Sequence, residues 1–228
     1  MRLERFLKLR TQTILMHIKL DHIMPEPLAS IKHSEDSIWG NLIELKSGNQ
    51  IMLNASSGKG KTTFAGIIYG LRRDYSGTVT FEGQDIRNFN PDEWTNIRRT
   101  KISAIFQDLQ LFPDLSVREN LLLKNQLTDT YSESEFKQML ERLEIEDKWD
   151  QHCGLLSMGQ RQRVAIIRAL AQPYEWLILD EPFSHLDVGN TNNCLEMIHE
   201  RTKEQGSGFV LTSLGSAHDY EYDYELKL

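Results

Sequence analysis

The chain has 228 residues, of which 39% are hydrophobic and 26% charged, enough to bury one substantial core. Its formal net charge of −7 argues against nucleic acid as the main partner, because duplex binding requires a basic surface. Cys153 and Cys194 have no paired spacing and no histidine cluster beside them, so we expect buried thiols and no zinc site. No apolar run reaches the roughly 18 residues of a membrane-spanning helix, so the chain is not expected to cross a bilayer by itself.

Residues 1–15, MRLERFLKLRTQTIL, are basic and loosely amphipathic but contain neither a continuous apolar segment nor a small-residue cleavage site. They therefore do not form a convincing secretory signal peptide. We interpret them as an N-terminal extension with little order, ahead of one domain at 16–228. A helix that lies on a membrane surface is the alternative.

The first part of that domain predicts strands, a glycine loop and a helix in succession. Segments 17–24, 41–48 and 49–55 have the alternating apolar pattern of short strands, and the turn sequence KSGN separates the last two. The loop SSGKG follows directly, and residues 62–73 have a helical pattern. This order is the local context that a phosphate-binding loop requires.

The rest of the chain alternates strands and helices around one long, charged helical segment at 116–149. In that segment, Ser132 and Glu135 have the spacing of a helix capping box. The other predicted elements are strands at 76–86, 102–107, 176–180 and 208–213 and helices at 91–99, 157–172 and 190–206. One face of a predicted C-terminal edge strand carries Tyr220, Tyr222, Tyr224 and Leu226. Strands that alternate with helices imply an α/β fold with a mainly parallel sheet covered on both faces.

The segment NASSGKGKTT nearly matches the phosphate-loop pattern G-x-x-x-x-G-K-[ST], with Ala55 in place of the first glycine. One methyl group at the strand exit is tolerable if φ stays negative, so we expect a functional loop. Its backbone N–H groups, backed by a helix N-terminus, suit phosphate oxygens. Lys61 adds a positive charge against the β and γ phosphates, and the Thr62 hydroxyl is placed to ligate Mg²⁺. The predicted nucleotide contacts are Ala55, Ser56, Ser57, Gly58, Lys59, Gly60, Lys61, Thr62 and Thr63.

A second segment, WLILDEP, places two carboxylates at the end of an apolar strand. Ligands gather at the carboxyl edge of a parallel sheet, so Asp180 and Glu181 are expected beside the phosphate loop. Asp180 would hold the Mg²⁺ shell, and Glu181 would polarise the attacking water. The alternative is an acidic pair in a solvated turn.

The third segment, LSMGQRQR, begins a helix with Ser157 at the capping position. The amides of Met158 and Gly159 point out of that helix start and suit another anion. One nucleotide does not need two phosphate sites within one chain. We therefore expect two chains to face each other head to tail, each closing the other's ATP.

In this order, the three segments resemble the ATP-binding cassette (ABC) ATPases, and the resemblance covers the chain from Met16 onward. FQ at Gln107 and SHLD at 184–187 also match motifs of that family. FQDLQLFPDLSVRENLLL most resembles the small ATPases of lipoprotein-releasing, macrolide-exporting and cell-division complexes. The resemblance implies a P-loop NTPase (RecA-like) core, an N-terminal antiparallel β subdomain and a helical insert at about 109–156.

The resemblance also implies roles for individual residues. Glu181, Lys61 and Gln107 would be catalytic, and the Mg²⁺ ligands would be Thr62, Gln107 and Asp180. Contacts to the ATP of the opposite copy would come from Ser157, Gly159 and Gln160, and Asp187 would touch that copy. The helical insert would carry the groove for a coupling helix of a separate transmembrane permease. Such a subunit works as a homodimer or a pair of different cassettes, cytoplasmic and peripheral on the inner face of the cell membrane.

The chain departs from the family pattern at two further positions. Trp39 is the aromatic residue upstream of the loop, and it stands where a core residue is expected, so stacking on adenine is in doubt. The strand GFVLTS has Ser213 where the family places a histidine against the γ-phosphate. Neither His185 nor His218 is an obvious substitute. Loss of such a hydrogen bond costs about 1.5 to 3 kcal/mol, so we expect an active but slow ATPase.

Two other functions remain open from the sequence. One is a largely non-catalytic, ATP-gated regulatory subunit, which Ser213 favours. The other is a soluble ABC ATPase of DNA repair or translation, although the long coiled coils, zinc modules or second cassette typical of that class are missing from the sequence. The residues indicate neither the cargo nor the direction of transport.

Overall fold

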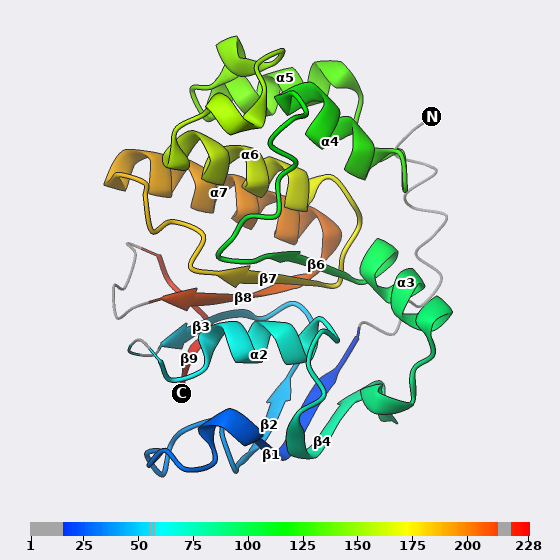
Figure 1. Ribbon diagram of the computed structural model, residues 1–228, viewed down its shortest axis with the longest axis vertical. Coiled ribbons are helices and arrows are strands. Elements are labelled where there is room, and N and C mark those ends of the chain that lie inside the picture. Colours follow the sequence, from blue (N-terminus) through cyan, green and yellow to red (C-terminus); the bar gives the residue numbers. More distant parts are fainter. Residues whose placement is uncertain (1–15, 55, 57, 214–219) are drawn as a thin grey trace.

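The structure is a computed structural model that describes residues 16–54, 56, 58–213 and 220–228. The expectations for residues 1–15, Ala55, Ser57 and His218 therefore lie outside the described residues. In Figure 1 a layer of helices lies above the central sheet, and α2 (Lys61–Ile68) and a smaller sheet lie below it.

Among the described residues, the strands form two sheets. The smaller one is four-stranded and antiparallel, in the order β2 (Leu42–Leu45), β1 (Ile18–Pro25), β4 (Tyr75–Phe81) and β5 (Gln84–Asp85). The larger one is five-stranded and parallel throughout, in the order β6 (Ile102–Ile105), β7 (Trp176–Asp180), β8 (Gly208–Ser213), β3 (Gln50–Asn54) and β9 (Tyr224–Lys227). The predicted α/β class, with a parallel core sheet and an N-terminal antiparallel subdomain, is confirmed.

The remaining helices begin at sequence signals that explain their positions. They are α3 (Pro91–Thr100), α4 (Val117–Asn125), α5 (Glu133–Arg142), α6 (Met158–Leu170) and α7 (Val188–Gln205), with short 3₁₀ helices at Glu26–Leu28, Ile86–Asn88, Glu146–Lys148 and Cys153–Leu155. Capping boxes start α3 to α6, and the predicted pair of Ser132 and Glu135 is confirmed as the cap of α5. Each box satisfies helix-terminal N–H groups that otherwise have no intrahelical partner.

The parallel sheet is buried on both faces, as the apolar runs of its strands predict. Along β7, Leu177 and Leu179 pack into a core with α4 to α7. Trp176 and Ile178 pack on the other side, with α2, α3 and the antiparallel sheet. Alternate side chains of a strand point to opposite faces, so one strand contributes to both cores.

The two cysteines are completely buried and unpaired. Burial raises the pKa of the Cys153 thiol to about 11 and that of Cys194 to about 12. Neither thiol is therefore an effective nucleophile near neutral pH, because the thiolate is the reactive form. The prediction that both are buried thiols is confirmed.

Three predicted elements differ from the structure. The strand predicted at 76–86 is a hairpin of β4 and β5, because the chain turns at Glu82 and Gly83, whose φ values are 50° and 78°. The helix predicted at 62–73 ends at Ile68, because the chain turns at Gly70, which has a φ of 74°. The C-terminal strand is limited to Tyr224–Lys227. Tyr220 and Tyr222 pack into the core beside α7, whereas Tyr224 and Leu226 pack into the opposite core, so these four residues do not share one face.

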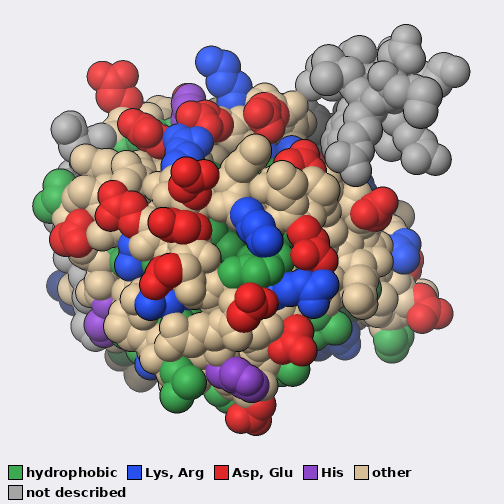
Figure 2. All heavy atoms as spheres, turned by 90° about the horizontal axis from the view of Figure 1, so that it is seen from above, with side chains coloured by type: hydrophobic (Ala, Val, Ile, Leu, Met, Phe, Trp, Pro, Cys, Tyr) green, Lys and Arg blue, Asp and Glu red, His purple; other side chains and the backbone are tan. Residues whose placement is uncertain are grey.

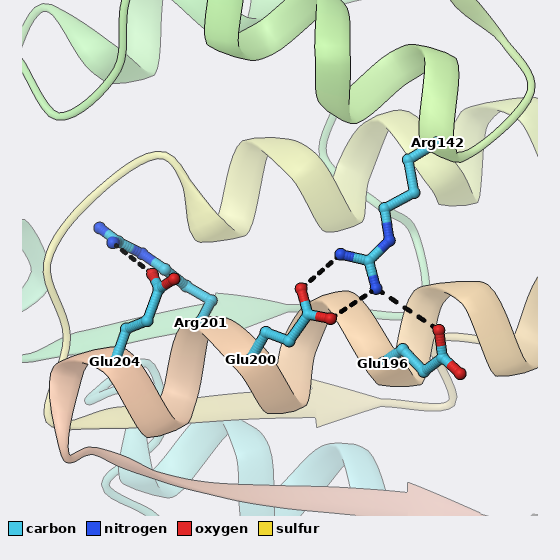
Figure 3. Close-up of polar contacts among 5 residues, drawn as sticks. All are labelled: Arg142, Glu196, Glu200, Arg201 and Glu204. Atoms are coloured by element: carbon cyan, nitrogen blue, oxygen red, sulfur yellow. Dashed lines mark hydrogen bonds and ion pairs between the residues drawn. The ribbon is translucent and has the colours of Figure 1, made fainter.

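Within residues 109–156, α4 and α5 lie against α6 and α7 (Figure 1). Arg142 on α5 forms ion pairs with Glu196 and Glu200 on α7, and its Nη2 lies 3.0 Å from Oε1 of Glu200 (Figure 3). These exposed contacts tie the insert to the core. Figure 2 views the molecule from the α4 and α5 end, where acidic and basic side chains surround a small hydrophobic patch. Within the described part of the chain, no helix combines the length and apolar character needed to span a bilayer.

Candidate functional site

The phosphate loop leads into α2 through Gly60, whose φ of 102° suits glycine. A Cβ atom at this position would lie 2.5 Å from Cδ1 of Leu28 and 3.0 Å from Cζ2 of Trp39, so only glycine fits. Gly58 also has a left-handed φ, at 78°. The loop thus keeps its backbone accessible by using glycine where a side chain would clash or strain the chain.

Trp39 packs against the phosphate loop and stabilises its conformation. Its side chain is buried at 3% exposure, and its indole Nε1 donates a hydrogen bond to the carbonyl oxygen of Lys59 at 3.0 Å. The ring therefore packs beneath the loop and presents no free face to a base. This position matches the expectation that Trp39 is a core residue.

Lys61, the first residue of α2, turns its side chain toward the end of β7. Its ammonium Nζ lies 3.2 Å from Oε1 of Glu181 and donates a hydrogen bond to the carbonyl oxygen of Ser56 at 3.3 Å. The Lys61 side chain is 5% exposed and that of Glu181 is 16% exposed. A charge pair so shielded from water interacts more strongly than one on the surface.

Asp180 and Glu181 are held in place by Thr212 of the neighbouring strand. The Thr212 hydroxyl donates to Oδ1 of Asp180 at 2.9 Å and accepts a hydrogen bond from the backbone N–H of Glu181 at 3.1 Å. Glu181 has a φ of 50°, a conformation that costs a non-glycine residue roughly 1 kcal/mol or more. Thr212 offsets part of this strain, and the turn directs the Glu181 carboxylate to Lys61.

The carboxyl group of Asp180 is 1% exposed, and burial raises its pKa. The negative charge of Glu181 also raises that pKa, while the Thr62 and Thr212 hydroxyls and Lys61 lower it. Oδ2 of Asp180 has no hydrogen-bond partner among the described residues. A buried carboxylate oxygen of this kind is costly unless it binds a proton or a cation.

Gln107 is exposed in the loop after β6 and shares a cavity of about 390 Å³ with Thr62 of α2. Two successive residues of this loop, Leu109 and Gln110, have φ values of 59° and 49°. Nη2 of Arg168 on α6 donates to the Leu109 carbonyl oxygen at 2.9 Å and holds the strained loop. The structure thus brings Gln107 and the phosphate loop to one cavity.

The N-terminus of α6 is capped by Ser157, whose hydroxyl accepts a hydrogen bond from the Gln160 N–H at 3.3 Å. A Cβ atom on Gly159 would lie 2.9 Å from the His185 carbonyl oxygen. The side chain of Gln162 fixes the same loop, since it donates to the Ser184 hydroxyl at 2.9 Å and accepts from the His185 N–H at 3.0 Å. The α6 N-terminus and loop 184–187 therefore form one unit.

This unit is separate from the phosphate loop within the described part of the chain, where no hydrogen bond or ion pair joins Ser157, Gly159 or Gln160 to α2. It is exposed, and Leu155 and Val188 beside it are 74% and 76% exposed. The phosphate loop and the α6 N-terminus are therefore two separate surfaces of the described chain.

Two other predicted positions have clear structural surroundings. The Asp187 side chain caps α7, and its Oδ1 accepts a hydrogen bond from the Asn190 N–H at 2.8 Å. Ser213 ends β8, where it pairs with Asn54 of β3, the last residue before the phosphate loop. Ser213 is buried, at 6% exposure.

Sequence reasoning missed Thr212, Gln162 and Arg168. Each acts through a contact between elements far apart in the sequence. Thr212 bonds Asp180 at the end of a strand, and Gln162 and Arg168 each bond a loop. Thr212 had one usable signal, because a hydroxyl at the end of a buried strand points to a special partner. Gln162 lies in the polar stretch QRQR, whose pattern does not distinguish it from solvent-facing residues, whereas Arg168 interrupts the apolar run VAIIRAL, which was a usable signal.

The fold and this site define a P-loop NTPase: a glycine loop and lysine start α2, and the carboxylates end β7, with β8 between β3 and β7. The family model described as "ABC transporter" matches residues 42–184. The lipoprotein-releasing system ATP-binding protein LolD of Buchnera aphidicola subsp. Schizaphis graminum is 31% identical over 183 residues, which are 79% of this chain and 78% of LolD.

Two further similarities concern a fused protein and a solved dimer. The macrolide export ATP-binding/permease protein MacB of Syntrophobacter fumaroxidans is 31% identical over 179 residues, covering 76% of this chain and 25% of MacB. A solved dimeric ATP-binding cassette in a post-hydrolysis state, bound to ADP and Pi, is 28% identical with a TM-score of 0.72, covering 86% of this chain and 87% of that one. The chain belongs to the ABC transporter family, as an ATP-binding subunit that hydrolyses ATP to power transport.

Proposed function

We propose that this ATPase subunit works as a dimer of cassettes on a separate membrane permease, in an export, lipoprotein-releasing or membrane-remodelling complex. The observation that carries the proposal is the separation of two surfaces. The phosphate loop and the exposed N-terminus of α6 lie apart in the single chain. Ser157 caps this N-terminus, and the exposed side chains of Leu155 and Val188 lie beside it. A second cassette facing head to tail completes each site and covers these apolar side chains.

The residues of this chain suit ATP hydrolysis. The N–H groups of Gly58 to Thr62 at the start of α2 bind phosphate oxygens, and Lys61 supplies the positive charge. The carboxylate of Glu181 accepts a hydrogen bond from the attacking water and polarises it. Gln107 orients that water from the cavity it shares with Thr62. The Ser157 hydroxyl and the N–H groups of α6 in the other copy bind the terminal phosphate.

We also propose that this site binds Mg²⁺ together with ATP. Oδ2 of Asp180 is buried without a hydrogen-bond partner among the described residues, and hydroxyl, amide and carboxylate oxygens are suitable donors for this ion. Asp180, Thr62 and Gln107 would hold it. When bound, Mg²⁺ neutralises charge on the phosphate oxygens and helps orient them.

The names of two relatives support an export or lipoprotein-releasing complex. LolD is named for a lipoprotein-releasing system, and MacB combines ATP-binding and permease functions in one chain. The present chain matches 25% of MacB. We therefore propose a cytoplasmic subunit, peripheral on the inner face of the cell membrane, with no role in nucleic-acid binding.

Nucleotide-driven dimerisation tests this proposal directly. Glu181→Gln should shift from monomer to dimer on addition of saturating Mg²⁺ and ATP, as measured by light scattering after size exclusion. The double variant Glu181→Gln with Leu155→Lys should stay monomeric while it still binds ATP. If Glu181→Gln stays monomeric even with its membrane subunit and any candidate second cassette, the dimer model is wrong.

Ser213 favours a second candidate function, that of an ATP-gated regulatory subunit. A buried serine in place of the family's histidine removes one donor near the γ-phosphate. Steady-state phosphate release separates the two functions, because a rate equal to that of Glu181→Gln would identify a non-catalytic subunit. Co-purification of a multi-span membrane protein would distinguish both from a soluble ABC ATPase.

A further inference from the structure

His185 is an exposed histidine in the loop that joins β7 to α7. It follows Glu181 closely in the sequence, yet the two residues belong to different surfaces. The Glu181 carboxylate points to Lys61 at the start of α2. The His185 backbone lies against the N-terminus of α6, where its carbonyl oxygen would be 2.9 Å from a Cβ atom on Gly159. One short loop therefore carries a carboxylate to the phosphate loop of its own chain and an imidazole to the surface that faces the other copy in the proposed dimer.

The backbone of this loop is fixed on both sides of His185. Gln162 of α6, which is 3% exposed, accepts a hydrogen bond from the His185 N–H at 3.0 Å. Phe183 is buried in the core, and its carbonyl oxygen accepts a hydrogen bond from the Leu186 N–H at 3.0 Å. Asp187 then caps α7. A loop held in this way keeps the imidazole in place before a ligand arrives, which lowers the entropy cost of the contact.

A chain of hydrogen bonds also orients the imidazole. A backbone N–H can only donate, so Oε1 of Gln162 faces His185, and the Gln162 amide Nε2 donates to the Ser184 hydroxyl at 2.9 Å. That hydroxyl lies 2.9 Å from Nδ1 of His185 and has its own hydrogen to donate to this ring nitrogen. A neutral imidazole that accepts at Nδ1 carries its hydrogen on Nε2. In the part of the chain that the structure describes, Nε2 has no hydrogen-bond partner, so this donor is available at the surface.

The surroundings of this donor suit an anion. The N–H groups at the start of α6 lie on the same unit, and a helix N-terminus favours negative charge. Asp187 is the one acidic residue in SHLD, and its carboxylate is already occupied. Its two oxygens accept hydrogen bonds from the N–H and the side-chain amide of Asn190, each at 2.8 Å. An imidazole donor beside helix N–H groups, without a free carboxylate on its own loop, suits a phosphate oxygen.

We propose that His185 is a catalytic residue that acts in trans: its Nε2–H donates a hydrogen bond to the γ-phosphate held by the phosphate loop of a second copy of this chain. The inference rests on the proposed function and deepens it, because it names a donor that crosses the dimer. The γ-phosphate is the group that meets the α6 N-terminus in the head-to-tail arrangement, and His185 lies against that N-terminus. No proton leaves the imidazole. It stabilises negative charge on the phosphate oxygens while the water polarised by Glu181 attacks.

Ser213 makes such a donor valuable. It is buried at the end of β8, so this strand supplies no imidazole to the γ-phosphate of its own chain. The transferred phosphoryl group has three oxygens, and a donor from the other copy approaches them from the opposite side. His185 and the new side chain of Ser213→His can therefore bond different oxygens. Neither donor makes the other redundant.

Hydrolysis rates test the contact. His185→Ala should lower the rate at saturating ATP at least about tenfold, the factor for one hydrogen bond to a charged group made in the transition state. The backbone N–H that bonds Gln162 is retained in this variant, so the loop should keep its conformation. His17→Ala is the matched control, because the His17 side chain is 39% exposed beside Glu44 of the antiparallel sheet. The control should hydrolyse ATP at the original rate, and an original rate in His185→Ala would overturn the inference.

Mixed dimers test whether the contact crosses between copies. A dimer with one His185→Ala copy and one Glu181→Gln copy has one complete site, formed by Glu181 of the first copy and His185 of the second. Mixing the two variants should therefore give several times the mean of their separate rates. A histidine that acts within its own chain would give no such gain. Ser157→Ala mixed with Glu181→Gln is the positive control, because Ser157 also acts in trans in the proposed dimer.

The outcomes separate this inference from the proposed function. If Glu181→Gln stays monomeric under all the conditions given above, the proposed dimer fails and this inference with it. If it dimerises only with a different cassette, or if the Ser157→Ala mixture gains activity and the His185→Ala mixture does not, only this inference fails. The double variant Glu181→Gln with His185→Ala should still dimerise with Mg²⁺ and ATP in light scattering. A monomer would mean that His185 serves assembly instead of hydrolysis, and would also overturn the inference.

Discussion

Lys61 and Glu181 form a shielded ion pair, with Nζ 3.2 Å from Oε1, that joins the start of α2 to the end of β7. Nearly buried charges of this kind are strongly coupled, so a change at one alters the electrostatics of the other. The cation that we propose binds phosphate and the carboxylate that we propose polarises water are therefore electrostatically linked in the chain itself.

Glu181→Gln should separate nucleotide binding from hydrolysis. The amide keeps the shape of the side chain but loses the charge that polarises water, so we expect the hydrolysis rate to fall at least about 100-fold. ATP affinity should stay equal or rise, because Lys61 is no longer neutralised by a carboxylate. Phosphate release and fluorescent-nucleotide titration measure the two effects. A variant that hydrolyses ATP at the original rate would show that another group polarises the water.

Ser213→His should raise the hydrolysis rate by about 10- to 150-fold. This is the rate factor that corresponds to one hydrogen bond to a charged group made only in the transition state. The control is Ser213→Ala, which removes the hydroxyl without adding a donor and should give no gain. Steady-state phosphate release at saturating ATP is the measurement. No gain from histidine, with ATP binding intact, would mean that another group already fills this role.

Gly159→Ala should weaken nucleotide-driven dimerisation while leaving ATP binding to the phosphate loop intact. The new methyl group meets the His185 carbonyl at 2.9 Å and forces apart the α6 N-terminus and loop 184–187. We expect at least tenfold weaker dimerisation in the Glu181→Gln background, equivalent to about 1.4 kcal/mol. Light scattering at varied protein concentration measures it.

Gly189→Ala is the matched control for that experiment. Its Cβ atom would lie 3.5 Å from Oδ1 of Asp187, an ordinary contact distance, in the first turn of α7. This variant should dimerise normally. Equal loss in both variants would attribute the effect to general disturbance of the loop rather than to the contact of Gly159 with His185.

Lys124 should make stability depend on pH. Its pKa of about 8 in the folded chain lies below the unfolded value near 10.4. The unfolded chain therefore binds more protons between these values, and stability rises with pH across this window, by at most about 3 kcal/mol. Lys124→Met should be more stable than the unaltered chain at pH 7, and the difference should shrink by pH 10. Urea unfolding at each pH measures it; a constant difference would contradict the low pKa.

Many local features of this protein could be predicted from short segments of its sequence. The phosphate loop, the WLILD strand and the capping boxes of Ser132 and Ser157 depend on residues within a few positions of each other. Backbone dihedral preferences, helix-terminal hydrogen bonds and apolar runs act over the same short range, so the sequence pattern determines them. The parallel sheet followed from strands alternating with helices.

Contacts between distant segments were decided only by the tertiary structure. Thr212 reaches Asp180 across 32 positions of sequence, and Arg168 reaches Leu109 across 59. The tail shows the same limit, because Tyr220 and Tyr224 enter opposite cores despite their shared alternation. Local chemistry thus set the loop, the carboxylates and the helix caps. Packing of strands and helices that are remote in sequence set how those groups are held, since side-chain partners depend on where the sheet and helices bring them.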